Sequence, residues 1–512
     1  MFSDGKIREK VTYEQMGKRA SRISAALARE GVMKGDRVLL LSENRPEWPI
    51  AYFGIALAGA VSVPLLTGFT AAQIRHIAFH AGAKAVCVSR AMAEKFETVK
   101  DRESSLESSL KESFSRIPFI YIDEITEDTN SVEEFSVTQG PDDLATIIYT
   151  SGTQGTSKGV MLSSGNIISS ALSSLSFFKI FSSDRFLSVL PIAHSYECGI
   201  GMIFPVIRGS SVTYIDKPPA PSVLLPALKA VRPTAMLSVP LLIEKMYSNS
   251  IAPKLKNNKL YRFPLTRRLA VKAAGRELVS AMGGKIRVFG IGGAPLSAEV
   301  EDFLYKAGFP YTIGYGLTET APLIAGNTPL RHAFNSGIEV AKGVSLRIEK
   351  REANPEDGEG EIQARGPNVM MGYYNDAEKT AQAFTPDGWL RTGDLGSLDK
   401  KGRLRVRGRL KSLILGPSGE NIYPEEIESV LGSSGLVEES LVYSGKKGEL
   451  VALVTLSETA KTAAGVIEHT LEDLRAWVNK KLTAFSRLNR IEIRSEPFEK
   501  TPTMKIKRYL YI

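Results

Sequence analysis

The 512-residue sequence predicts an α/β protein with a parallel sheet, followed by a small β unit and a final α+β segment. Three observations support this fold class. In the first part of the chain, apolar residues at helical spacing alternate with short apolar runs, as in βαβ units. Residues 331–407 instead hold short strands such as VSLRIE and GEIQARG, separated by Gly, Pro and Asp, which predicts a small antiparallel or barrel-like unit. From Gly408 the α+β pattern returns, so we expect a domain boundary there.

The N-terminal elements follow in order. Residues 12–31 carry apolar side chains at helical spacing and predict a helix, and the run DRVLLLS after it predicts a short buried strand. Residues 48–65 predict a buried helix that leads into a second strand, and residues 83–89 predict a third strand. Residues 101–115 are rich in Ser and Glu and predict an exposed helix or loop.

The composition excludes several classes of protein. With 43% hydrophobic and 24% charged residues, the chain is expected to be soluble and long enough for more than one compact unit. Cys87 and Cys198 have no CxxC or metal-ligand spacing, so neither a disulfide framework nor a structural zinc is expected. The N-terminus lacks an apolar signal segment, and no run reaches the roughly 18 apolar residues that a spanning helix needs. We therefore expect a cytoplasmic protein.

The net charge of +9 predicts attraction to anions, whether nucleotides, phospholipid or nucleic acid. Residues 251–287 hold ten Lys or Arg against one acid, Glu277. Such a cluster is either a solvated helical face or a contact for a phosphate or an anionic surface. A nucleic-acid-binding protein is an alternative on charge alone. Because the sequence has no basic stripe with interleaved aromatic residues, we expect no nucleic-acid partner.

The segment YTSGTQGTSKG, residues 149–159, is rich in groups that bind phosphate. The apolar run LATIIYT before it predicts a strand and NIISSALSSLSFF after it predicts a helix, so we expect the segment to be the loop between them. Glycines let backbone approach a ligand, and backbone N–H groups, hydroxyls and Lys158 donate to phosphate oxygens. A Walker A loop is excluded because Ser157 precedes the lysine and Gly159 follows it. We interpret the segment as a phosphate cradle; taken alone, it is also compatible with a flexible linker.

The extended segment YTSGTQGTSKGVMLS closely resembles the signature loop of the adenylate-forming superfamily, which includes acyl-CoA synthetases, luciferases and nonribosomal adenylation domains. Further motifs of that family follow in its order: GGAPL (292–296), GYGLTET (314–320), GWLRTGDLG (388–396), GRLKSLI (408–414), SGENIYPEEIE (418–428) and TPTMKIKR (501–508). The resemblance covers nearly the whole chain. It implies a large N-terminal domain, residues 1–407, made of two α/β subdomains and a small β-barrel-like unit. It also implies a small, mobile α+β C-terminal lid domain, residues 408–512.

The resemblance implies roles for individual residues. The residues that it implies for ATP binding are Thr150, Ser151, Gly152, Thr153, Thr156, Lys158, Gly293, Ala294, Gly314, Tyr315, Thr318, Asp394 and Arg409. Among them, Tyr315 matches the aromatic residue that stacks on adenine, and Asp394 matches the acid that binds the ribose hydroxyls. Glu319 matches a carboxylate linked to magnesium, and Lys505 matches the lysine that reaches the reacting carboxylate and the α-phosphate. The implied catalytic set is Lys505, Glu319, Thr318 and Lys158.

Four further residues match positions of the acyl and thiol steps. His194 matches a PxxH position at the acyl pocket, and Lys411 matches the hinge between the two domains. Ser418 and Gly419 match a turn that contacts the pantetheine arm of CoA. One static surface cannot easily present both Lys505 and the Gly419 turn to the same reaction centre. A mobile C-terminal domain would present them in turn.

We therefore expect an AMP-forming acid–thiol ligase that uses ATP, Mg²⁺ and CoA and acts on a medium- to long-chain fatty acid. PIAHSYE and TPTMKIKR resemble the bacterial long-chain branch of the family. One alternative is an acyl-acyl-carrier-protein synthetase whose basic segment, residues 251–287, docks an acidic carrier protein. Another alternative is a stand-alone adenylation domain for a different carboxylic acid. Contact with the inner face of a membrane is also left open by the sequence.

Overall fold

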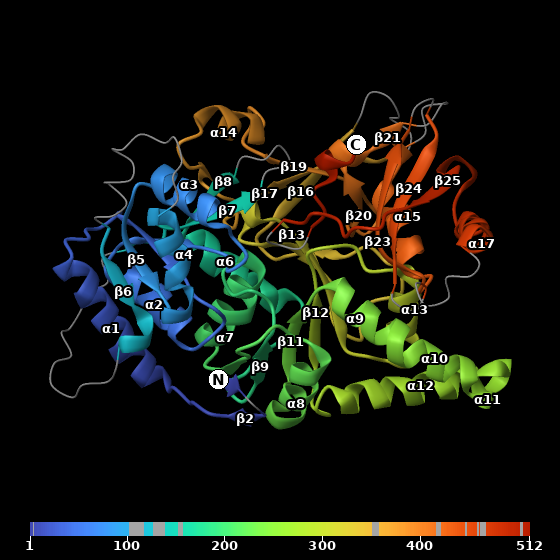
Figure 1. Ribbon diagram of the computed structural model, residues 1–512, viewed down its shortest axis with the longest axis horizontal. Helices are drawn as coiled ribbons and strands as arrows, with labels where there is room; N and C mark the ends of the chain where they lie inside the picture. The colour runs from blue at the N-terminus through green and yellow to red at the C-terminus, as the bar shows by residue number, and fades with distance from the viewer. Residues whose placement is uncertain are drawn as a thin grey trace.

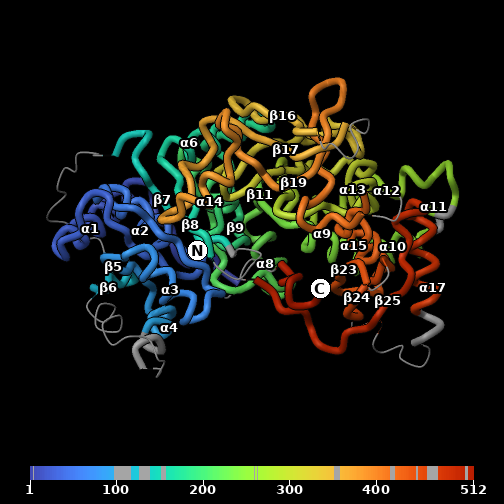
Figure 2. Tube along the Cα trace, turned by 90° about the horizontal axis from the view of Figure 1, so that it is seen from above, coloured from blue at the N-terminus to red at the C-terminus, as the bar shows by residue number. Residues whose placement is uncertain are grey.

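The computed structural model describes residues 1–3, 5–101, 117–125, 139–151, 157–350, 358–415, 421–445, 448–457, 460, 467–501 and 505–512. All but the first residue of the predicted Ser- and Glu-rich segment 101–115 lies outside these ranges. The N-terminal helices and the C-terminal unit occupy opposite ends of the molecule, blue and red in Figures 1 and 2. Within the described ranges, no helix has both the length and the apolar character needed to cross a membrane.

The first large sheet has the strand order β18-β8-β7-β4-β3-β5-β6. Strands β7, β4, β3, β5 and β6 run parallel, which confirms the predicted parallel sheet, whereas β8 and β18 are antiparallel additions. The strands are β3 (Arg37–Leu41), β4 (Val61–Pro64), β5 (Ala83–Val88), β6 (Phe119–Tyr121), β7 (Leu144–Ser151), β8 (Ser157–Ser163) and β18 (Gly372–Tyr373).

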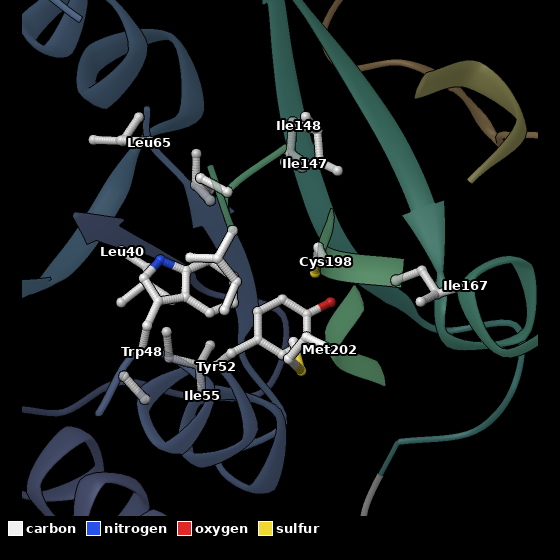
Figure 3. Close-up of a cluster of buried hydrophobic side chains, with 14 of the residues drawn as sticks. Leu40, Trp48, Tyr52, Ile55, Leu65, Ile147, Ile148, Ile167, Cys198 and Met202 are labelled. Atoms are coloured by element: carbon white, nitrogen blue, oxygen red, sulfur yellow. The ribbon is translucent and has the colours of Figure 1, made fainter. Parts of the chain in front are cut away.

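The helices around this sheet are α1 (Tyr13–Arg29), α2 (Glu47–Leu57), α3 (Ala71–Ala81), α4 (Arg90–Asp101) and α6 (Ser164–Ser173). The predicted helix at 12–31 is confirmed as α1, which begins at a capping box formed by Thr12 and Gln15. Helix α2 is apolar on all sides and therefore buried. Figure 3 shows Trp48 and Tyr52 of α2, stacked with ring centroids 5.4 Å apart, close to Met202 of the π-helical segment η3 (Glu197–Ile203).

The prediction that a loop joins β7 directly to a helix was wrong. After residues 152–156 the chain returns as β8, antiparallel to β7, and α6 begins only at Ser164. Lys158 therefore lies on a strand, paired with Thr150. The buried residues Val160 and Leu162 have the two-residue period of a strand, but the run is too short for that period to stand out from the adjoining loop.

The second large sheet has the order β10-β9-β11-β12-β13-β14-β15 and is parallel from β10 to β13. Its strands are β9 (Arg185–Ser188), β10 (Ser211–Tyr214), β11 (Ala235–Ser238), β12 (Val288–Ile291), β13 (Tyr311–Gly316), β14 (Leu323–Gly326) and β15 (Glu339–Val340). The helical elements that accompany it are α7 (Phe204–Ile207), α8 (Pro221–Val231), α9 (Pro240–Met246), η4 (Tyr247–Ile251), α10 (Ala252–Asn257), α11 (Lys259–Arg262), α12 (Pro264–Ala281) and α13 (Ala298–Ala307).

A small antiparallel sheet follows, as predicted for residues 331–407. Its order is β16-β17-β19-β20, with β16 (Ser345–Lys350), β17 (Gly360–Arg365), β19 (Leu390–Leu398) and β20 (Leu404–Arg409). Helix α14 (Ala377–Ala383) lies between β18 and β19 in sequence. Because β20 continues to Arg409, the short helix η6 (Leu410–Ser412) with Lys411 forms the junction to the C-terminal unit.

The C-terminal unit is α+β. Its elements are β21 (Ile414–Leu415), β22 (Asn421–Ile422), α15 (Pro424–Gly432), β23 (Val437–Ser444), β24 (Leu450–Leu456), α17 (Ile467–Asn479) and β25 (Arg490–Ile493). Strands β23, β24 and β25 form one sheet, and their apolar residues pack with α15 and α17 into a separate core. Exposed ion pairs join this unit to the second large sheet region, with Lys245 Nζ 3.3 Å from Glu438 Oε1 and Lys481 Nζ 3.8 Å from Glu299 Oε2. The exact division at residue 408 stays a prediction.

Candidate active site

The carboxyl ends of β12 and β13 bring two of the predicted motifs together. These strands are parallel, with Ile291 paired to Ile313, so Gly293 and Tyr315 follow at equivalent positions on the same edge of the sheet. Gly293 has φ of +86°, a conformation that favours glycine, and Gly293 and Ala294 are exposed. Ligands of open parallel sheets bind outside the carboxyl ends of the strands. Gly293, Ala294, Gly314 and Tyr315 are therefore placed where a planar base could lie.

Asp394 lies beside Tyr315 and is held by two donors. The Tyr315 hydroxyl donates to Asp394 Oδ2 at 2.7 Å, and Arg409 Nε lies 3.0 Å from Oδ1. Asp394 and Arg409 are paired across β19 and β20, which places the guanidinium next to the carboxylate. Burial raises the pKa of Asp394, while Arg409, the Tyr315 hydrogen bond and Lys505 lower it. The structure thus brings Tyr315, Asp394 and Arg409 together, although their motifs are up to 94 residues apart (315 to 409).

Thr318 and Glu319 lie on the short helix η5 (Thr318–Thr320), directly after β13. A tight turn fixes this helix: a Cβ on Gly316 would lie 1.6 Å from the Pro322 carbonyl oxygen, so only glycine fits there. The Thr320 hydroxyl donates to that same Pro322 oxygen at 2.9 Å. The turn therefore sets the direction in which Glu319 projects.

Glu319 and Lys158 meet around an aromatic residue that sequence reasoning missed. The Tyr373 hydroxyl donates to Glu319 Oε1 at 3.0 Å, and Lys158 Nζ lies 4.7 Å from the Tyr373 ring centroid. Tyr373 belongs to β18, which pairs with β8 and so lies next to Lys158. No predicted motif includes residues 372–374. The antiparallel addition of β18 to β8, which was not predicted, is what brings Tyr373 here.

Positive charge gathers at the end of the β7–β8 hairpin. Partial burial lowers the pKa of Lys158; Glu319 raises it, and Lys379 and the hinge residue Lys411 lower it further. The predicted hinge residue thus lies within electrostatic reach of the cradle lysine. Thr150 and Ser151 lie on β7 of the same hairpin, whereas Gly152, Thr153 and Thr156 lie outside the described residues. Asp376 also raises the pKa of Lys158, and Lys379 Nζ pairs with Asp376 Oδ2 at 2.5 Å. Lys158 and Lys411 are therefore the cations at this hairpin that could bind a polyanion.

His194 lies between β9 and η3, on the segment that faces Thr318. The neighbouring Ser195 Oγ lies 3.4 Å from Thr318 Oγ1. The backbone N–H of Tyr196 donates to His194 Nδ1 at 3.3 Å, so a neutral His194 carries its proton on Nε2. Burial, with a smaller contribution from Lys505, lowers the pKa of His194 to about 4. The imidazole is therefore neutral at physiological pH.

Lys505 reaches this site from the C-terminal segment. Its side chain keeps access to solvent, but the surrounding protein desolvates the amine and lowers its pKa. Arg409 lowers that pKa further, whereas Asp394 and Glu319 raise it. The Thr501 N–H donates to the Lys505 carbonyl at 2.7 Å. The structure thus brings Lys505 together with both acidic motif residues.

Two predicted residues remain outside this description. Ser418 and Gly419 belong to residues 416–420, which the structure does not describe. The strands on either side of them, β21 and β22, pair with each other antiparallel.

Comparison with known proteins identifies the family. The family model for AMP-binding enzymes matches residues 2–374, and the model for the AMP-binding enzyme C-terminal domain matches residues 426–505. The chain belongs to this family, which confirms the resemblance to the adenylate-forming superfamily.

The chain is also similar over nearly its full length to individual proteins. It is 30% identical to long chain acyl-CoA synthetase 6, peroxisomal, of Arabidopsis thaliana, with 97% of this chain and 79% of that protein covered. It resembles the structure of o-succinylbenzoate CoA synthetase (MenE) from Bacillus subtilis in complex with the acyl-adenylate intermediate OSB-AMP, at 26% identity and a TM-score of 0.76, with 98% and 93% of the chains covered. ATP-bound MatB from Rhodopseudomonas palustris matches with 25% identity, a TM-score of 0.76 and the same coverage, 98% and 93%. These structures confirm the predicted fold class.

Proposed function

We propose that the protein activates a long-chain fatty acid with ATP and then transfers the acyl group to CoA, which gives acyl-CoA, AMP and pyrophosphate. The observation that carries this proposal is the convergence of Lys505 with Glu319 and Asp394 at the carboxyl ends of β12 and β13. Family membership and the named similarity to a long-chain acyl-CoA synthetase support the substrate class.

The first step joins two anions, because the fatty carboxylate attacks the α-phosphorus of ATP and pyrophosphate leaves. Catalysis of such a step consists mainly of positioning the reactants and neutralising charge. Lys505, on the C-terminal segment, would stabilise the charge on the carboxylate and the α-phosphate. Lys158, on β8, would bind the β- and γ-phosphates. Lys158 would then stabilise the negative charge that develops on the leaving pyrophosphate.

Nucleotide binding is assigned to the residues next to Lys505. Tyr315 would stack on adenine, with Gly293, Ala294 and Gly314 lining the base. Asp394 would accept hydrogen bonds from the ribose hydroxyls. Its position favours this role, because Tyr315 and Arg409 fix both carboxylate oxygens while burial keeps competing water away.

Glu319 fits a magnesium ion. Mg²⁺ is usually held by one or two carboxylates together with substrate phosphates, not by a cage of protein ligands. Glu319 supplies one such carboxylate, Tyr373 orients it, and the described residues form no cluster of three or more His, Cys, Asp or Glu that could enclose a metal. When bound, the ion would neutralise phosphate charge. Thr318 lies next to this carboxylate and would donate to the phosphates.

The acyl chain is assigned to the region of His194. A neutral imidazole adds no charge to an apolar pocket, and the pKa of about 4 keeps it neutral. The adjoining segment η3 is apolar after its first residue and buried throughout. We place the fatty acid carboxylate near Lys505 and its chain beside His194 and η3.

The second step requires a different surface of the C-terminal unit. We propose that the C-terminal unit beyond Lys411 rotates about that residue, so that the turn of Ser418 and Gly419 replaces Lys505 and admits the pantetheine arm of CoA. The position of Lys411 in η6, immediately after the last strand of the small sheet, supports a hinge at this residue. Exclusion of water from the acyl-adenylate between the two steps would prevent its hydrolysis.

Separate assays of the two half-reactions test the proposal. We expect Lys505→Ala to reduce fatty-acid-dependent pyrophosphate exchange by about 100-fold or more, because it removes a charge that acts on the transition state. Thioester formation from supplied acyl-adenylate should be nearly unchanged. The matched control is Lys507→Ala, which removes a lysine two residues away whose amine pairs with Glu499. Exchange that proceeds equally well without any carboxylic acid would contradict the proposed function. Equal loss of both half-reactions in Lys505→Ala would contradict the alternation of surfaces.

A further inference from the structure

A helical arm projects from the second large sheet region and carries unusually exposed apolar side chains. The chain runs outward through α9, η4, α10 and α11 and returns along α12, and Figures 1 and 2 show α11 at the edge of the molecule. The apolar side chains near the tip are Leu260 (52% exposed), Phe263 (66%), Leu265 (95%) and Leu269 (64%). Single exposed apolar residues are common in proteins, but four within ten residues at one projecting tip indicate an interaction surface.

The outer face of α12 combines these apolar residues with cations. At 100° per residue, Leu265, Arg268, Leu269, Lys272 and Arg276 fall within a stripe about 100° wide. All five are exposed. We call these five residues the α12 stripe.

The opposite face of α12 fixes the direction of the stripe. Ala270, Val271 and Leu278 are buried in the core of the second sheet region. Gly275 brings α12 close to α13, because a Cβ at this position would lie 2.6 Å from the Ala307 carbonyl oxygen. The helix therefore cannot rotate to hide Leu265 and Leu269, and the α12 stripe faces outward.

The charge of the arm is almost entirely positive. Glu277 is the only acid in residues 251–287, and Lys254 already pairs with it. Arg267 stacks on Tyr261, with its guanidinium carbon 4.5 Å from the ring centroid. Among the described residues, Arg268, Lys272 and Arg276 have no ion-pair partner. These three side chains could therefore bind an anionic partner without first breaking an ion pair within the protein.

We propose that the α12 stripe and the adjoining tip residues dock the enzyme on an anionic phospholipid bilayer. Apolar side chains that enter the acyl-chain boundary and basic side chains that lie at the headgroups are the two features of helices that bind in a membrane interface. An acidic carrier protein would satisfy the cations, but it would not require Leu265 to be almost fully exposed on a projecting tip. The inference rests on this surface alone and does not depend on which acid the enzyme activates.

Vesicle flotation tests the proposal with the full chain. The probes are vesicles of phosphatidylcholine alone and vesicles that contain 30% phosphatidylglycerol, at low and high salt. We expect the protein to float with the anionic vesicles and to be released by salt, since exposed charges are screened within about 10 Å at 0.1 M. Each basic residue near an anionic membrane contributes about fivefold in affinity. Arg268→Ala with Lys272→Ala should therefore weaken binding roughly 30-fold, and Leu265→Ser with Leu269→Ser should weaken it about tenfold or more.

Matched controls separate the arm from general surface effects. Lys400→Ala with Lys401→Ala removes two exposed lysines from the turn between β19 and β20, and Phe79→Ser removes a side chain that is 66% exposed on α3. These variants should bind vesicles as the wild type does. Pyrophosphate exchange with a short, soluble fatty acid should be unchanged in all variants, which reports an intact fold. Equal binding of arm variants and wild type would overturn the proposal. So would a lack of vesicle binding combined with arm-dependent binding of an acidic carrier protein.

Discussion

Glu197 places a carboxyl group in the apolar interior of the N-terminal half, and this gives a quantitative prediction about stability. The residue is 2% exposed and begins η3, where a Cβ on Gly201 would lie 2.6 Å from its carboxyl carbon. Burial raises the pKa of Glu197 to about 8, and among the described residues its Oε2 has no hydrogen-bond partner that would stabilise the charged form. The carboxyl is therefore largely protonated in the folded protein at neutral pH.

The sign and size of the effect follow from linkage. Between pH 4.5 and about 8 the unfolded chain loses this proton while the folded protein keeps it, so the stability contributed by Glu197 falls as the pH rises. The interval from 4.5 to about 8, at about 1.4 kcal/mol for each pKa unit, corresponds to about 5 kcal/mol lost by pH 8. Roughly 3 kcal/mol of this is already lost at pH 7. The penalty is absent at low pH, where both states are protonated.

Glu197→Gln tests this because the amide has nearly the same size and cannot ionise. We expect the wild type and the variant to have similar free energies of unfolding at pH 5, and the variant to be more stable by several kcal/mol at pH 8. The measurement is urea unfolding at pH 5, 6, 7 and 8, followed by the fluorescence of Trp48 with Trp389 and Trp477 replaced by Phe. Trp48 lies in the same core as η3, so it reports unfolding of this region.

The control is Glu30→Gln, which changes an exposed glutamate at the end of α1. It should leave the pH dependence of the wild type intact. If the unfolding free energies of Glu197→Gln and the wild type stay parallel from pH 5 to pH 8, the carboxyl is ionised in the folded protein and the reasoning from burial is refuted.

Three predictions concern the active site. Lys158→Ala should raise the KM for ATP by about 10- to 150-fold, the equivalent of one charge-assisted contact of roughly 1.5–3 kcal/mol, and leave the KM for the fatty acid nearly unchanged; an unchanged KM for ATP would mean that this lysine does not bind phosphate. Tyr373→Phe removes the hydrogen bond to Glu319 and should raise the Mg²⁺ concentration needed for half-maximal pyrophosphate exchange by up to about tenfold; an unaltered Mg²⁺ titration would separate Glu319 from the metal. Asp394→Asn should reduce the preference for ATP over 2′,3′-dideoxy-ATP in steady-state exchange to nearly none, because the ribose loses its charged acceptor; a preserved preference would show that the ribose is bound elsewhere.

The sequence was informative where chemistry depends on short contiguous motifs. The predicted α/β fold and the antiparallel β unit were confirmed, and Tyr315, Asp394, Arg409, Glu319 and Lys505 lie together as the motifs implied. A motif places its residues on one loop, and the alternation of strands and helices indicates that such loops gather at one edge of a parallel sheet. The functional roles of these residues stay predictions.

Contacts that depend on strand pairing could not be predicted. Tyr373 reaches Glu319 only because β18 adds to β8, a pairing between strands separated by more than 200 residues of chain. The hairpin of β7 and β8 was missed for a related reason, since a strand of seven residues gives too short a pattern to be separated from its loop. The sequence indicated the positive charge of the helical arm. It could not indicate the exposure of Leu265, which depends on how α12 packs against α13.

The way in which the C-terminal unit is held bears on whether it can move. Far from the hinge, its described ion pairs with the body are Lys245–Glu438 and Lys481–Glu299, and both partners of each pair are at least 41% exposed. Exposed ion pairs contribute about 0–1 kcal/mol each, so breaking both would cost little. Near the hinge, Tyr423 instead donates to Glu359 of the small-sheet region at 2.6 Å. A unit that is weakly held at its far side and anchored near Lys411 is suited to rotation about that residue, which is the motion that alternation between Lys505 and the Gly419 turn requires.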